Sequence, residues 1–185
     1  MPERPHCAVL GERPRAEDML GNPIQAIRRE HDRQALACDR LAALATEAEP
    51  APVAAEIDAL LVFLREDLAW HTADEEIDLF PSLRARCTPA DGIEGILDQL
   101  SREHALDKDI ADFLVDDLTA SAARAGWAPP RRFGINAHAF AETQRRHLDW
   151  ENNLVLPLAQ SRLTADDLRE LGRNMARRRG VQLPD

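Results

Sequence analysis

The stretch "HTADEEIDLFP", residues 71–81, has the same skeleton as "HLDWENNLVLP", residues 147–157. In both stretches a glutamate follows the histidine by four residues and a proline follows it by ten. The tripeptide "REH" also occurs twice, at residues 29–31 and 102–104. Since residues four apart lie on one face of a helix, each HxxxE pair predicts a histidine and a glutamate that point the same way. The repeats therefore predict a polar site built twice on helices.

The segments around these motifs favour helices. They are rich in Ala, Leu, Glu, Asp and Arg and poor in β-branched residues, and clusters of Gly and Pro separate them. We expect helices near residues 24–48, 53–86, 91–123 and 130–160, and a shorter one at 165–178 that "TADD" opens at Thr164 and Gly180 ends. The fold class is therefore all-α: an up-down-up-down four-helix bundle with a short additional C-terminal helix.

The expected organisation has three parts. Residues 1–21 read as an irregular N-terminal arm, residues 22–160 as the bundle, and residues 161–185 as the C-terminal helix and tail. We expect Pro81 and Pro157 to kink or end the last turns of their helices, because proline lacks the N–H that a helix interior needs.

Composition narrows the partners and the compartment. The 185 residues carry a net charge of −10, which argues against nucleic acid or an anionic membrane as a partner. The longest strongly apolar run, "ALLVFL" at 59–64, is too short to cross a bilayer, and the first 20 residues lack the apolar stretch of a signal peptide. Three cysteines without a CxxC pair favour a reducing compartment. We expect a cytoplasmic protein.

Four histidines interrupt the apolar stripes of the four long helices. They are His31, His71, His104 and His147. Counted from the predicted turn at Pro50, His31 and His71 are 19 and 21 residues away, and the other neighbouring pairs agree to within about one helical turn. All four imidazoles should therefore lie at one level of the core. Glu75 and Glu151, one turn beyond their own histidines, should point to the same level.

Burying four imidazoles and two carboxylates together is costly unless something neutralises them. One interpretation is a polar network in which the histidines pair with the glutamates. The other is a metal site, which the repetition of six such residues at one level favours. Six ligands are too many for one tetrahedral zinc but suit two octahedral ions, with the carboxylates bridging. Mixed imidazole and carboxylate ligands suit iron first, with manganese, cobalt or zinc as surrogates.

The pattern H…HxxxE…H…HxxxE on four helices resembles the hemerythrin family, in its HHE cation-binding branch. The resemblance covers about residues 22–160, and "REHD", "HTADEEIDLFP" and "REHA" are its typical phrases. It implies two non-haem iron ions joined by an oxo or hydroxo bridge. Carried onto the matching positions, it implies terminal ligands at His31 and His71 for one iron and at His104 and His147 for the other, with Glu75 and Glu151 bridging.

Two positions differ from the oxygen carriers that this family contains. The carriers place a second histidine one turn after the third-helix histidine, where this chain has Lys108. They also place the fourth-helix carboxylate one residue later, where this chain has Asn152 after Glu151. Simple reversible O2 carriage is therefore not favoured. Asp107 could fill the gap directly or through water, although orienting a ligand histidine is the commoner role and the one we expect.

The ligand set also bears on the chemistry. Ferritin-like di-iron sites use four carboxylates and two histidines, whereas this chain has the reverse ratio. Such a site suits binding or reducing O2, peroxide or NO. We therefore expect a cytoplasmic di-iron protein that binds O2 or these related oxidants. The alternatives are a di-iron oxidase, peroxidase or NO reductase, or an iron or oxygen sensor that acts through a partner protein by its C-terminal helix. A redox partner is compatible with each.

Other conspicuous residues are expected to have structural roles. His138 precedes His147 by nine residues and so faces away from the site. Cys38 falls on an apolar stripe and reads as a buried thiol. Trp70 and Trp150 should pack against the site. The "ARRRG" run at 176–180 should complement a helix dipole, and His6 and Cys7 have no partners at metal-site spacing.

Overall fold

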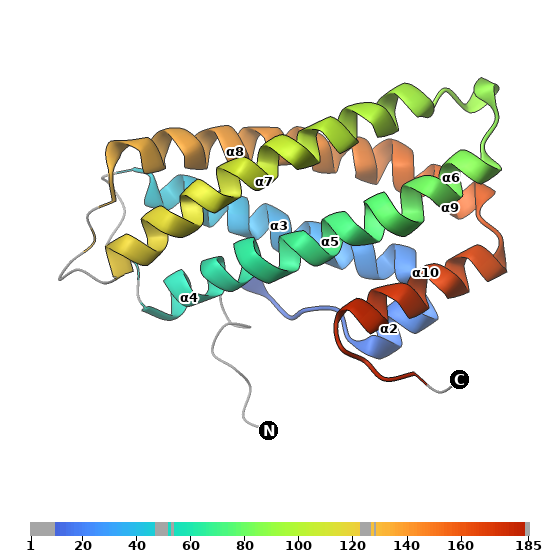
Figure 1. The fold of residues 1–185 in the computed structure, drawn as a ribbon, viewed down its shortest axis with the longest axis horizontal. Helices are drawn as coiled ribbons and strands as arrows, with labels where there is room; N and C mark the ends of the chain where they lie inside the picture. Colours follow the sequence, from blue (N-terminus) through green and yellow to red (C-terminus); the bar gives the residue numbers. More distant parts are fainter. Residues whose placement is uncertain (1–9, 47–51, 53, 123–126, 128, 184–185) are drawn as a thin grey trace.

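A computed structural model describes residues 10–46, 52, 54–122, 127 and 129–183. Every regular element in these ranges is helical (Figure 1), which confirms the predicted all-α class. The arm residues His6 and Cys7 lie outside the described residues.

Four long rods form the bundle, and successive rods run in opposite directions (Figure 1). The first is α3 (Pro23–Leu44) and the third is α7 (Glu94–Ala122). The second joins α4 (Ala54–Val62), η1 (Phe63–Asp67), α5 (Leu68–Asp74), η2 (Glu75–Leu79) and α6 (Phe80–Arg86). The fourth joins α8 (Arg131–Trp150), η4 (Glu151–Val155) and α9 (Leu156–Arg162). A 3-10 turn, η3 (Pro89–Asp91), precedes α7.

Two shorter helices lie beside one end of the bundle (Figure 1). One is α10 (Ala165–Arg178), which Thr164 caps by accepting a hydrogen bond from the N–H of Asp167. The other, α2 (Ala16–Gly21), corrects the expectation of an irregular arm through residue 21. The two helices pack closely, since a β-carbon at Gly172 would overlap the carbonyl oxygen of Met19. The division of the chain at residues 21 and 160 stays a prediction.

Pro81 and Pro157 do not end their helices, which continue to Arg86 and Arg162. Instead, a π turn directly precedes each proline-containing segment: η2 before α6 and η4 before α9. In these turns the N–H of Phe80 donates to the Glu75 carbonyl, five residues back, and the N–H of Leu156 donates to that of Glu151. A proline ring clashes with the carbonyl four residues earlier in an α-helix. The wider π turn shifts the bonding by one residue and accommodates the ring.

The apolar core is divided into two clusters, one on each side of the four histidines along the bundle. One contains Leu41, Phe63, Leu114 and Phe140, and the other contains Ile27, Phe80, Leu100 and Leu156. The histidines thus occupy a polar layer between two apolar layers. No helix in the described part of the chain has the length and the apolar character that a bilayer span requires.

Candidate metal centre

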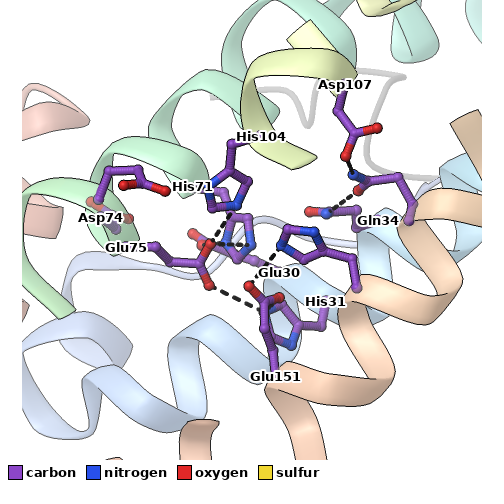
Figure 2. Close-up of polar contacts among 12 residues, drawn as sticks. Glu30, His31, Gln34, His71, Asp74, Glu75, His104, Asp107 and Glu151 are labelled. Carbon is purple, nitrogen blue, oxygen red and sulfur yellow. Dashed lines mark hydrogen bonds and ion pairs between the residues drawn. The ribbon is translucent and has the colours of Figure 1, made fainter. Parts of the chain in front are cut away.

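The six candidate ligands come together in the polar layer, and Figure 2 shows His31, His71, His104, Glu75 and Glu151 directed toward one another. All six are buried, the most exposed being His104 at 9%. Their ligand atoms form two groups, each within 4.8 Å: His31, His71, Glu75 and Glu151; and Glu75, His104, His147 and Glu151. Both glutamates belong to both groups. The structure thus brings all six predicted residues together, and their role as ligands stays a prediction.

The glutamates reach the centre from the first residues of the π turns. Glu75 opens η2 and Glu151 opens η4, each one turn after its own histidine. The carboxylate of Glu151 lies 2.8 Å from Nε2 of His147, and that of Glu75 lies 3.5 Å from Nε2 of His71. The repeated HxxxE…P skeleton therefore has a local structural basis. The helix places the histidine and the glutamate on one face, and the π turn that follows accommodates the proline ring.

Most atoms that face the centre lack a hydrogen-bond partner in the described structure. They are Nε2 of His31, His71 and His104, both carboxylate oxygens of Glu75, and Oε2 of Glu151. The Glu75 carboxylate lies 3.2 Å from His104 Nε2 and 3.9 Å from His31 Nε2, close enough for attraction but not aligned as hydrogen bonds. Each unsatisfied buried polar group costs about 1–3 kcal/mol. A self-contained histidine–glutamate network would pair these atoms, whereas imidazole nitrogens and carboxylate oxygens converging on two points fit two cations.

The glutamate of each REH tripeptide supports a histidine on the next rod. Nδ1–H of His71 donates to Glu30 at 3.3 Å, and Nδ1 of His147 lies 3.4 Å from the carboxylate of Glu103. A carboxylate at Nδ1 sets the tautomer that leaves Nε2 free to bind a metal, and it makes that nitrogen more basic. Sequence reasoning missed both glutamates, although the signal was available: each directly precedes a candidate ligand histidine in a repeated tripeptide.

The residues that follow Glu75 and Glu151 support the other two histidines. Nδ1–H of His104 donates to Glu76 at 2.6 Å, and Nδ1–H of His31 donates to the side-chain oxygen of Asn152 at 2.9 Å. Asn152 occupies the position where the oxygen carriers have their carboxylate, and here it orients a histidine instead. The outer partners therefore follow the same twofold repeat as the candidate ligands.

Without metal, the site balances its glutamates with protons. Burial would lower the pKa of His71, but the charge of Glu75 and the hydrogen bond to Glu30 outweigh it and raise this pKa to about 9. Burial would also lower the pKa of His104, but the contacts of this imidazole with Glu75 and Glu76 outweigh burial and raise the pKa to about 10. Burial would raise the pKa of Glu75, but the neighbouring imidazoles hold it well below its usual range.

Asp107 does not have the role expected of it. Its carboxylate accepts a hydrogen bond from Gln144 at 2.7 Å, and Gln144 in turn accepts one from Gln34 (Figure 2). The other oxygen of Asp107 has no partner in the described structure, and burial raises the pKa of the group. Lys108 points to solvent, with a side chain 74% exposed and 2.8 Å from Asp112. The position of the carriers' extra histidine therefore contributes nothing to the site.

The C-terminal arginines do more than complement a helix dipole. Arg179 lies 2.7 Å from both Glu30 and Asp74, and Arg178 pairs with Asp74 and Asp78. Arg179 also lies 5.6 Å from the ring of Trp70. Because Glu30 holds His71, these contacts tie the end of α10 to the candidate metal centre.

Two further expectations are confirmed. His138 is exposed on α8, away from the site. Cys38 is fully buried, and burial raises the pKa of its thiol to about 12. Trp150, for which we expect packing against the site, is half-buried and packs against the apolar cluster that contains Phe80 and Leu156, so that expectation is not among those confirmed.

Comparison with known families supports a metal-binding domain. A family model described as "Hemerythrin HHE cation binding domain" matches residues 22–159. The matched range includes all six candidate ligands and their four outer partners. A search of curated proteins gave no match.

Metal binding should expel protons. Against the effect of burial, the neighbouring carboxylates raise the pKa of His71 to about 9 and that of His104 to about 10, and Glu151 raises the pKa of His147, so these imidazoles should carry protons in the metal-free protein at pH 7. A metal needs the neutral imidazole, so loading at pH 7 should release at least two protons per chain, and affinity should rise with pH until about pH 10. Calorimetric titration with Co²⁺ in buffers of different ionisation enthalpy measures this release. Heats that do not depend on the buffer would contradict it.

The same raised pKa values give the metal-free protein a characteristic stability profile. Raised histidine pKa values stabilise the fold fully below the ordinary value of 6.5, and this stabilisation is lost as pH rises through about 9 to 10. Metal-loaded protein, with neutral imidazoles, should not show this loss. Thermal unfolding of both forms between pH 6 and about 10 compares them.

Glu30→Gln should weaken metal binding by about 10–100-fold, because it removes the negative charge that makes His71 a stronger ligand. Competition against a coloured chelator measures the affinity. The matched control is Glu142→Gln, whose side chain is 77% exposed and pairs with Arg145 at the surface. Equal affinities in the two variants would show that Glu30 does not support the site.

Proposed function

Because the chain belongs to the hemerythrin HHE cation-binding family, we propose that it holds two non-haem iron ions and binds O2, peroxide or NO in the cytoplasm. The observation that carries this proposal is the pair of ligand groups that share Glu75 and Glu151. In the proposed arrangement, one ion takes His31 and His71, the other takes His104 and His147, and both glutamates bridge.

Iron is the metal that this donor set favours. Both groups combine imidazole with carboxylate, and neither contains a thiolate. Manganese, cobalt or zinc could occupy the same positions as surrogates. Bound iron would supply one-electron redox chemistry toward O2, peroxide or NO, with an oxo or hydroxo bridge completing the pair.

The chain's own residues would control that chemistry by charge and by exclusion of water. The apolar clusters on both sides would limit the access of water to the polar layer along the bundle. With both glutamates bound, a pair of divalent ions would keep an excess charge of about +2. The carboxylates of Glu30, Glu76 and Glu103 lie behind three of the histidines and would offset that charge. These outer carboxylates favour the oxidised state more than the ligands alone would, so the reduced site should give up electrons readily.

A sensor is the second candidate function, because Arg179 contacts Glu30, which holds His71. A change of charge at the metal centre would reach the end of α10 through these contacts, and a partner protein would detect it there. Metal-dependent hydrogen exchange in residues 165–178 would favour this candidate.

An enzyme is the third, favoured by Asp107. Its free carboxylate oxygen is buried one turn from His104, where it could hold a proton for a bound oxidant. Turnover of O2, peroxide or NO with a reductant would favour an oxidase, a peroxidase or an NO reductase.

Protein expressed with iron should contain about two metal ions per chain, and the oxidised form should absorb in the near ultraviolet by charge transfer to iron. His147→Ala should lose one ion or both, because it removes a central ligand atom. His138→Ala is the matched control on the same helix and should retain both. Elemental analysis that finds one zinc and no second ion, or equal losses in the two variants, would refute the assignment.

The reduced protein should oxidise rapidly in air, because the exposed Lys108 leaves the ion held by His104 and His147 without the extra ligand of the oxygen carriers. Stopped-flow absorbance should pass to the oxidised spectrum, and argon should not reverse it. Hydrogen peroxide should oxidise the protein too. An O2-bound form that lasts for hours and releases O2 under argon would make reversible carriage the better assignment.

A further inference from the structure

A groove between the second rod and α7 opens beside the candidate metal centre. Its volume is about 610 Å³, within the range of sites that bind small organic molecules. Leu64, Leu68, Ala69, Ala73, Ala111 and Val115 line its walls. Ile77 also lines it and is 63% exposed. Leu64, Leu68 and Ala111 belong to the apolar cluster that contains Phe63 and Leu114, so the groove is an accessible edge of the apolar core.

One end of the groove reaches the metal centre. His104 and Glu76 line it there, joined by the hydrogen bond that orients the imidazole. The side chain of His104 is 7% exposed, the most of the four candidate ligand histidines. A molecule in the groove would thus lie next to the ion that His104 and His147 are proposed to hold, on the side of the centre where Lys108 replaces a histidine.

Charged side chains line the groove in equal numbers of each sign: Arg65 and Lys108, and Glu76 and Asp112. Lys108 pairs with Asp112 at 2.8 Å, and Glu76 accepts a hydrogen bond from His104. Arg65, at the end of the groove away from His104, donates instead to Thr119, a neutral hydroxyl, at 3.1 Å. Its guanidinium has five N–H donors, so it can also bind an anionic group on an otherwise apolar molecule.

The groove is long rather than round. From Arg65 to Ile77 the second rod advances twelve residues, or about 18 Å at the rise of a helix. Small side chains keep it open along this length, with Ala69 and Ala73 on α5 and Ala105 and Ala111 on α7. An extended chain fits this shape better than a compact ring system does.

We propose that this groove binds an elongated, mainly apolar organic acid, with its carboxylate near Arg65 and its apolar end toward His104. The proposal rests on the proposed function only in making this acid a ligand of the metal centre, since the groove itself consists of protein side chains. An organic acid bound in this groove would be the molecule that reacts, or acts as a signal, at that centre.

Decanoate is the probe, with decanol as its uncharged counterpart. Titration calorimetry of the metal-loaded and metal-free proteins should show one saturable site for decanoate. In the Co²⁺-loaded protein, decanoate should also shift the visible absorption bands, because its apolar end would lie beside His104. Binding without a spectral shift would contradict the orientation, and absence of saturable binding in both forms would overturn the site while leaving the metal content of the proposed function intact.

Variants locate the binding. Ala69→Trp and Ala105→Trp fill the groove from opposite sides at exposed positions, and each should weaken decanoate and decanol at least tenfold. Ala139→Trp, exposed on α8 outside the groove, is the matched control and should leave both affinities unchanged. Arg65→Glu should weaken decanoate far more than decanol, and Arg102→Glu, exposed on α7 outside the groove, should not.

A second copy of the chain is the competing occupant. Light scattering across concentrations distinguishes it: a monomer that binds decanoate supports the proposal. A dimer that Ala69→Trp dissociates would make the groove a subunit interface and overturn the proposal.

Discussion

The carboxylates of Glu75 and Glu151 have no solvent exposure, and the rest of the structure depends on how their buried charge is neutralised. An ionised carboxylate in a protein interior costs several kcal/mol unless positive charge surrounds it. Here the surrounding groups are four imidazoles, one from each rod of the bundle. Each rod must therefore be long enough, and correctly placed, to deliver its histidine to the same level. The two apolar clusters, one on each side, supply the packing that holds the four rods in that register.

Charge alternates outward from this centre. Around the histidines lie Glu30, Glu76, Glu103 and Asn152, and each of these is held by a further residue. Arg179 contacts Glu30 at 2.7 Å, Arg146 contacts Glu103 at 2.8 Å, Ser101 donates to Glu76 at 2.9 Å, and Arg28 donates to Asn152. A buried polar network is favourable when its members are satisfied, and each outer member has at least one contact with a further side chain. Among the described residues, the largest group of unpaired buried atoms lies at the centre, where a cation would complete them; others, including Oε2 of Glu103 and Oδ1 of Asp107, lie outside it.

The sequence contained enough to predict the bundle and the six central residues, because both depend on periodicity within single helices. His71 and Glu75 share a face whatever surrounds them, and the distances between turns place the histidines at one level. The partners across helices were harder to predict. The REH repeat marks Glu30 and Glu103, but nothing local says that Glu30 faces His71 rather than its neighbour His31. The contact of Arg179 with Glu30 spans 149 residues, and only the packing of α10 on the bundle creates it. Asp107 shows the same limit, since its partner Gln144 lies on a different rod.

The π turns have a consequence for the evolutionary record of such a chain. Each holds one residue more than an α turn of the same height, so the helix before it and the helix after it differ in phase by about 100°. If a related protein has an ordinary α turn at the position of η2, its alignment with this chain should contain a single-residue gap inside a continuous helix. No loop lies nearby in which the gap could be placed instead. The gap would fall between Glu75 and Pro81. Its presence would mean that Phe80 and Leu83, both buried here, had rotated away from the core unless a second change compensated. Insertions and deletions within these few residues should therefore be inherited together with the proline, as one unit.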